Sequence, residues 1–117
     1  MTRALGRAYI AFCPASERSL LLDMLAASKD PEDAAARNRD AALTQLAMIK
    51  RSGFADRSTM VEPKSSSTIA VPITLGRKVL ATVGVTFFTS AIPKAAAVAR
   101  YVPPLKEMAK NIQTSVV

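Results

Sequence analysis

The stretch STIAVPITLGRKVLATVGVTFF, residues 67–88, limits the possible folds of this chain more than any other. Residues 68–74 and 77–88 are rich in β-branched and aromatic side chains, and Leu75-Gly76 supplies a tight turn between them. Strands joined by so short a turn pair in the antiparallel sense. A weaker strand is predicted at 54–62, where Pro63 ends it. The sequence therefore predicts a three-stranded antiparallel sheet in the second half of the chain.

The first half has helical periodicity. A helix is predicted over 2–13, capped by Thr2 and ended by Pro14, and another over 15–27. The range 31–52 is also predicted to be helical, with Asp30 as N-cap, a restart at Asn38 or Asp40, and Gly53 as the left-handed residue after its end. The residues expected to face the core from these helices are Leu5, Ala8, Tyr9, Phe12, Leu20, Leu21, Met24, Leu25, Ala42, Leu43, Leu46 and Ile49.

A last helix is predicted over 90–113, kinked by Pro103-Pro104 because two backbone N–H donors are missing there. Its apolar stripe stays in phase across the prolines. The predicted stripe is Val98, Tyr101, Val102, Leu105, Met108, Ala109 and Ile112. The 117 residues suit one domain. The expected fold class is α+β, an antiparallel sheet covered by helices.

The two faces of the strand at 77–88 differ in character. One face is apolar and carries Val79, Ala81, Val83, Val85 and Phe87. The other carries Leu80, Thr82, Gly84, Thr86 and Phe88. Small and hydroxyl-bearing residues with apolar ends could line a pocket for a polar ligand. The alternative is that Thr82 and Thr86 are strand-forming residues that face water.

The composition argues against several classes of function. The chain carries 16 basic and 9 acidic residues, which gives a net charge of +7. Because the basic residues are scattered along the sequence, we expect them to lie on the solvated surface rather than to form a nucleic-acid interface. There is no histidine, and the single cysteine, Cys13, is predicted to be a small buried residue of the core. We therefore predict no enzyme, no cofactor and no metal site. The lone cysteine and the absence of long apolar runs favour a cytoplasmic protein without a membrane partner.

Four motifs in order resemble one known family. They are LGRAYIAFCP, IKRSGFADR, the STIAVP strand and the following GRKVLATVGV strand. Together they resemble the effector-binding domain of IclR-type transcriptional regulators, with the ending TFF…RYVPPL most similar to the MhpR-like subgroup of aromatic-acid catabolism. The resemblance implies a GAF/profilin-like domain and covers essentially the whole chain.

The resemblance also implies a ligand site between the sheet and the helices. The family's pocket positions correspond to Ala4, Leu5, Ser66, Thr68, Gly84 and Thr86 of this sequence. Asp56 or Arg57 would supply the polar residue after the GF turn, and Arg57 would pair with a carboxylate. Gly84 replaces a serine of some members, which implies room for a larger, aromatic acid. The alternative for Arg57 is an ordinary surface arginine.

Family members carry a DNA-binding domain and further strands before the GRA helix. We therefore expect a domain truncated on its N-terminal side, without direct DNA binding, whose open sheet edge lies beside residues 77–88 and favours a homodimer or higher homo-oligomer. The implied function is a small-molecule effector-sensing and dimerisation module of a transcriptional regulator, binding a small organic or aromatic acid. The alternatives are a free-standing ligand-binding or oligomerisation module without DNA-binding function, and an enzyme on the same scaffold.

Overall fold

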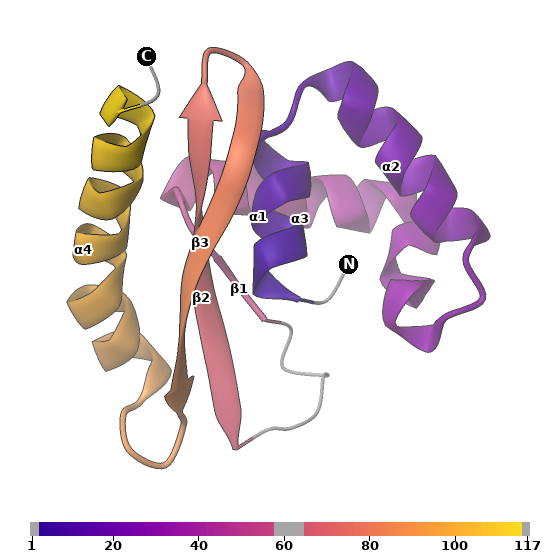
Figure 1. Cartoon of the computed structure of the whole chain (residues 1–117). Coiled ribbons are helices and arrows are strands. Elements are labelled where there is room, and N and C mark those ends of the chain that lie inside the picture. The colour runs from indigo at the N-terminus through magenta and orange to yellow at the C-terminus, as the bar shows by residue number, and fades with distance from the viewer. Residues whose placement is uncertain (1–2, 58–64, 116–117) are drawn as a thin grey trace.

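A computed structural model describes residues 3–57 and 65–115 of the chain. The described residues form helices on both sides of a small antiparallel sheet, which confirms the predicted α+β class (Figure 1). The elements in order are α1 (Ala4–Phe12), α2 (Ala15–Ala27), η1 (Pro31–Arg37), α3 (Arg39–Ser52), β1 (Ala55–Asp56), β2 (Ser66–Leu75), β3 (Lys78–Phe88) and α4 (Lys94–Ser115).

The sheet has the strand order β1-β2-β3, and both pairs are antiparallel. Leu75 pairs with Lys78, so the two turn residues are Gly76 and Arg77 rather than the predicted Leu75 and Gly76. Gly76 has φ +62, and no described non-glycine residue has positive φ. A two-residue turn with positive φ at its first residue only is of type II′, which suits the twist of a hairpin. Glycine is therefore needed at position 76.

The first strand is shorter than predicted. β1 comprises Ala55 and Asp56, and the backbone N–H of Arg57 adds a 3.1 Å hydrogen bond to the carbonyl oxygen of Thr68. The rest of the predicted strand, residues 58–62, and the predicted cap Thr2 lie outside the described residues. β2 begins at Ser66, two residues before the predicted start, because Ser66 and Ser67 continue the pairing with Phe88 and Phe87.

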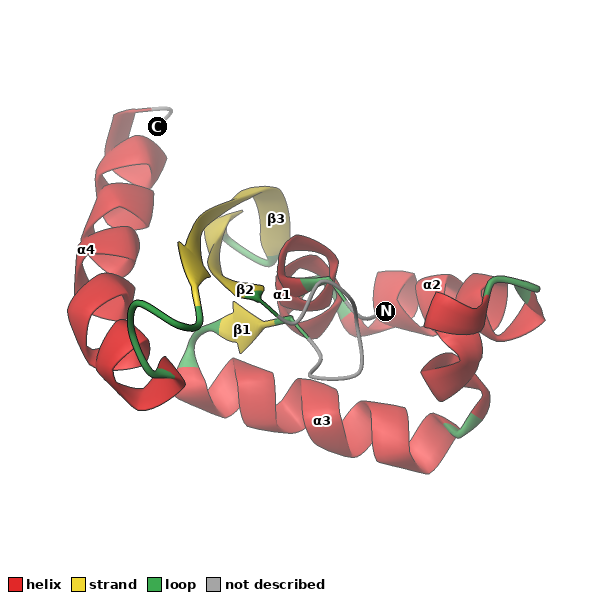
Figure 2. Ribbon diagram, turned by 90° about the horizontal axis from the view of Figure 1, so that it is seen from below, coloured by secondary structure: helices red, strands yellow, loops and turns green. Residues whose placement is uncertain are grey.

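The two faces of the sheet carry different helices. Figure 2 shows α1 on one side of the strands, α4 on the other and α3 below β1. Alternate residues of β2 point to opposite sides, so Ala70 joins the core around α1 whereas Ile69 and Val71 join the core around α4. A single strand thus contributes to two cores.

The buried face of α1 overlaps only in part with the predicted stripe, of which Ala8 is fully buried. The buried residues of the helix are Ala4, Ala8, Ile10 and Ala11. Leu5 is 45% exposed, and Tyr9 and Phe12 are only partly buried. The observed stripe consists mostly of alanines, because small side chains let a helix approach a sheet closely.

In the segment from α2 to α3 the helix caps are those that were predicted, whereas some residues predicted to be buried are exposed. The Asp30 side chain accepts a 2.9 Å hydrogen bond from the Glu32 N–H, and Asn38 caps α3 through the Ala41 N–H. The cap at Asn38 divides the predicted helical range, whose first part is a 3-10 helix. Gly53 has φ +86, as its predicted position after the helix requires. Leu20 and Met24, predicted in the core, are 65% and 69% exposed, and Leu22 is the buried residue of α2.

The helix α4 continues without a break through Pro103 and Pro104. It begins at Lys94 rather than at 90, because Pro93 disfavours helical geometry at Ile92. Its buried residues are Ala97, Val102, Leu105 and Ala109. Met108 and Ile112, predicted in the same stripe, are 50% and 38% exposed. No helix within the described residues is long and apolar enough to cross a bilayer.

Candidate functional site

The predicted hydroxyl-bearing face of the hairpin lies on the α1 side of the sheet. Thr68 of β2 pairs directly with Thr86 of β3, and their Oγ1 atoms lie 2.9 Å apart, within hydrogen-bond distance. One hydroxyl donates to the other, which leaves a second proton and free lone pairs for a ligand. Thr86 is exposed and Thr68 is half-buried, so the pair is accessible.

Gly84 brings Leu5 close to this pair. A Cβ atom at position 84 would lie 2.8 Å from the Ile69 carbonyl oxygen and 3.4 Å from both Leu5 Cδ2 and Thr68 Cγ2. The glycine therefore allows the close approach of α1 and β2. Part of the room predicted for a larger ligand at Gly84 is occupied by Leu5, which supplies an apolar wall beside the hydroxyl pair.

Arg57 lies in the same row of the sheet. Its backbone bonds to Thr68, and its Nη2 lies 3.5 Å from Ser66 Oγ, at the outer limit of a hydrogen bond. Both side chains are half-buried. The guanidinium of Arg57 thus lies near Ser66, which precedes Thr68 by two residues on β2.

The remaining predicted residue, Ala4, differs from the others in its burial. It is 2% exposed and packs in the core around α1, so Leu5 rather than Ala4 offers accessible surface at this end of the helix. The N-cap residue of α1, Arg3, makes no side-chain cap hydrogen bond. As in any helix, the first-turn amide groups of α1 have no intrahelical acceptors, and Leu5 of this turn lies against Gly84.

Asp56, the alternative to Arg57, belongs to a different cluster. Its carboxylate pairs with Lys94 Nζ and lies 3.7 Å from Arg7 Nη1, which also donates a 2.8 Å hydrogen bond to the Asp56 carbonyl oxygen. The Arg7 side chain is 12% exposed, and its buried Nε has no hydrogen-bond partner within the described part of the chain. Asp56 therefore neutralises a buried guanidinium at the junction of α1, β1 and α4.

Arg18 was predicted as solvated surface, but it caps the far end of α1. Its guanidinium donates to the carbonyl oxygens of Ile10, Ala11 and Cys13, at 3.0, 3.1 and 2.8 Å. Cys13 is 2% exposed, and burial raises the pKa of its thiol. Cys13 is therefore a buried residue, as predicted, and its neutral thiol is a poor nucleophile.

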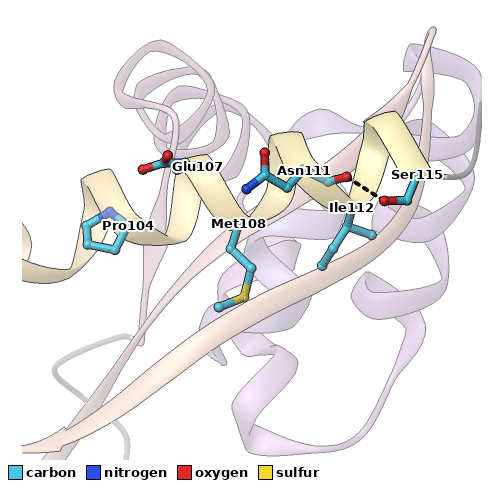
Figure 3. Close-up of a pocket in the computed structure, with 6 residues that line it drawn as sticks. All are labelled: Pro104, Glu107, Met108, Asn111, Ile112 and Ser115. Carbon is cyan, nitrogen blue, oxygen red and sulfur yellow. Dashed lines mark hydrogen bonds between the residues drawn. The ribbon is translucent and has the colours of Figure 1, made fainter.

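Three hollows lined by described residues lie away from the threonine pair. One of about 390 Å³ lies near Arg18, Lys50 and Arg77, and one of about 300 Å³ lies between Arg7, α3 and Lys94. The third, of about 410 Å³, runs along the outer side of α4 (Figure 3). Across residues 3–57 and 65–115, no group of three or more histidine, cysteine or acidic side chains could hold a metal ion.

The roles of Arg7 and Arg18 were missed in the sequence because each depends on a distant backbone. A basic residue among small apolar neighbours, as in LGRAYIAF, is the one signal that could have indicated a buried arginine. Nothing in the sequence identifies Asp56, 49 residues away, as the residue that Arg7 contacts.

No protein-family model matches the chain. Solved structures do. An IclR transcriptional regulator from Alicyclobacillus acidocaldarius is 24% identical to the chain, and the match covers 97% of this chain and 44% of that one. The C-terminal domain of the Escherichia coli regulator KdgR is 19% identical, with 97% and 68% covered. The inducer-binding domain of PobR from Acinetobacter, a double mutant in complex with 3-hydroxybenzoic acid, is 12% identical, with 96% and 63% covered.

All three structures superpose with a TM-score of 0.73. The chain spans a little under half the length of the first regulator and about two thirds of the two isolated domains. All three are transcriptional regulators or their domains, and none is described as an enzyme. The agreement extends over nearly every residue of this chain and confirms the resemblance predicted from its motifs. The chain has the fold of the C-terminal effector-binding domain of IclR-family transcriptional regulators.

Proposed function

We propose that the chain is an effector-sensing module of a transcriptional regulator that binds a small aromatic acid at the threonine pair. The observation that carries the proposal is the placement of Thr68, Thr86, Arg57, Ser66 and Leu5 around one end of α1. Two hydroxyls and a hydroxymethyl group can bond a hydroxyl or carboxylate, and Arg57 supplies positive charge. Leu5 supplies an apolar wall for a ring.

The proposed ligand class has two supports besides these residues. The first turn of α1, which contains Leu5, favours an anion at this end of the helix, because the positive end of the helix dipole lies there. One of the structures with the same fold, the PobR domain, is a complex with 3-hydroxybenzoic acid. In this proposal the ligand carboxylate lies near Arg57 and the ring lies against Leu5. The proposed compartment is the cytoplasm.

Ligand binding would act on the regulator through differential affinity. An acid that binds one arrangement of the domain more tightly than another shifts the population toward it, and it can transmit no more free energy than that difference. The module would in this way report the acid to a DNA-binding region that belongs to the proposed full-length regulator.

The proposal is tested by calorimetric titration and thermal unfolding with 3-hydroxybenzoate, 3-hydroxyphenylpropionate, cinnamate and glyoxylate. A ligand at about 100 times its Kd stabilises the fold by about 2.7 kcal/mol, which raises the Tm of a domain of this size by several degrees. Thr86→Val keeps the shape but removes a hydroxyl, and we expect it to weaken binding about tenfold. Arg57→Ala should weaken binding of every carboxylate.

Matched controls separate binding from folding. Thr74→Val makes the same change on β2 near the hairpin turn, and Arg51→Ala removes an exposed arginine at the end of α3. Both should bind like the wild type. Equal losses in Thr74→Val and Thr86→Val would contradict the proposed site, and the absence of binding by every acid would contradict the proposed ligand class.

A further inference from the structure

The hollow of about 390 Å³ lies at the end of the molecule where the hairpin turn approaches the junction of α1 and α2 (Figure 1). β1 pairs with Ala70 and Ile69 only, so the last residues of β2 run past it toward the turn. The hollow lies there, with Thr74 of β2 on one wall and Lys50 of α3 on another. None of the described residues that line it belongs to β3.

The hollow is basic. Arg18, Lys50 and Arg77 line it, and none of its described lining residues is acidic. Lys50 and Arg77 are exposed, and neither forms an ion pair or a side-chain hydrogen bond with a residue that the structure describes. Cations that line a concave surface without counter-charges attract an anion and raise its local concentration.

One of these cations is held in place before any ligand binds. The Nε and Nη2 atoms of half-buried Arg18 donate to the three carbonyl oxygens at the end of α1. Those bonds use three of the five guanidinium N–H groups, and the two on Nη1 have no acceptor among the described residues. A fixed guanidinium loses little conformational freedom when it binds an anion.

The first turn of α2 adds positive potential to the same hollow. Ala15 is the first residue of this 13-residue helix and lines the hollow, so the positive end of the helix dipole lies there. The negative end of α1 is also near, but Arg18 donates to its carbonyl oxygens. The Glu17 carboxylate accepts a hydrogen bond from the Tyr9 hydroxyl and does not line the hollow.

We propose that this hollow binds a small phosphorylated metabolite, with its phosphate group between Arg18, Lys50 and Arg77. A phosphate monoester carries between one and two negative charges at neutral pH, and its three terminal oxygens accept charge-assisted hydrogen bonds. Its volume is within the range of small-molecule pockets and exceeds that of a phosphate group alone. Half-buried Phe12 and Pro14 supply apolar surface for the organic part.

This site is distinct from the threonine pair. Leu5 lies at the start of α1 and Phe12 at its end, about 10 Å apart along the helix axis. The inference therefore goes beyond the proposed function and is tested without an aromatic acid.

The proposal is tested by calorimetry and by NMR titration of the isotope-labelled chain in a low-salt buffer without phosphate. The probes are glycerol 3-phosphate, inorganic phosphate and acetate. We expect saturable binding of glycerol 3-phosphate, at least tenfold tighter than that of acetate, with the largest amide shifts at Ala15, Gly76 and Arg77. Binding should weaken as salt is added. No saturation, equal affinity for acetate, or shifts centred on Thr68 and Thr86 would overturn the proposal.

Four variants separate the site from the overall charge of the chain. Lys50→Met and Arg77→Met each remove one lining cation but keep an apolar stem, and each should weaken binding about tenfold. Arg51→Met and Lys78→Met remove the same charge one residue further along the chain, from exposed side chains that do not line the hollow. These controls should change affinity by less than about twofold. Equal losses in all four variants would mean that the anion responds to net charge alone, which would contradict the site.

The probes also distinguish the source of the phosphate group. Glycerol 3-phosphate should bind more tightly than inorganic phosphate, because Phe12 and Pro14 contact its organic part. Equal affinities would contradict the organic ligand. A short DNA duplex that binds in an Arg77-dependent manner, without binding of glycerol 3-phosphate, would replace the proposal by a nucleic-acid contact.

The two proposed sites can fail separately. Thr86→Val should leave the affinity for glycerol 3-phosphate unchanged, and Arg77→Met should leave that for 3-hydroxybenzoate unchanged. Binding of glycerol 3-phosphate by a chain that binds none of the aromatic acids would contradict the proposed function and support this site.

Discussion

Gly84 and Gly6 differ in whether the surrounding structure leaves room for a side chain, and substitution by alanine tests this difference. Gly84→Ala would place a Cβ 2.8 Å from a backbone oxygen of the paired strand, which cannot move without opening the ladder. We expect a loss of about 1–3 kcal/mol in the free energy of unfolding. A Cβ at Gly6, within α1, meets no heavy atom within 4 Å. Gly6→Ala should therefore stabilise the chain by about 0.5–1 kcal/mol.

Urea denaturation of the two variants measures this contrast. A Gly84→Ala variant as stable as the wild type would mean that β2 and β3 yield at this point, and the close approach of α1 would then not depend on the glycine. The two substitutions act as controls for each other, since both remove the same conformational freedom from the unfolded chain.

The choice between Asp56 and Arg57 illustrates what a sequence alone could not decide. β1 is short, and a shift of one residue in its register exchanges which side chain lies on each face. The pairing of Ala55 with Ala70 fixes the register. Asp56 then lies with Arg7 and Lys94, and Arg57 lies beside Ser66 and Thr68.

The end of α1 depends on a side chain from the next helix. Arg18 donates hydrogen bonds to the carbonyl oxygens of Ile10, Ala11 and Cys13. These oxygens lie after the last backbone hydrogen bond of α1, in which the Cys13 N–H donates to the Tyr9 carbonyl oxygen. Arg18→Met keeps an apolar stem but removes all three hydrogen bonds, and we expect a destabilisation of about 1–3 kcal/mol. Arg77→Met, at the exposed hairpin turn, serves as the control and should change stability by less than about 0.5 kcal/mol. Similar values for the two variants would show that Arg18 does not stabilise the helix end.

The elements were predictable to different degrees, and the reason is packing. The hairpin follows from alternation and from Gly76, and the ends of α1 and α3 follow from Pro14 and Gly53, because these signals are local. The buried face of a helix depends on what covers it. The predicted stripe of α1 was right for Ala8 and wrong for Leu5, because the sheet is close enough to α1 to require alanines. The sequence also predicted burial of Leu20 and Met24, although α2 packs mainly on η1.

At the scale of the whole molecule, the sheet separates two cores. The core around α1 includes residues of α2, α3 and β1, and the core around α4 includes Ile69, Val71, Phe87 and Leu105. The strand β2 joins the two cores, because Ala70 belongs to the first and Ile69 and Val71 belong to the second. Asp56 adds a second connection, because it contacts Arg7 of α1 and Lys94 of α4.

The connection at Asp56 should stabilise the chain far more than a surface ion pair. Asp56→Ala leaves the Arg7 guanidinium, 12% exposed, without its counter-charge, and the expected cost is about 2–4 kcal/mol. Glu32→Ala breaks the pair with Arg3, whose side chains are 53% and 43% exposed, and should cost less than about 1 kcal/mol. Urea denaturation in low and high salt measures both. Salt should diminish the effect of Glu32→Ala but not that of Asp56→Ala, because a buried charge is screened less. Equal costs, or equal sensitivity to salt, would mean that the two faces of the sheet are held together without Asp56.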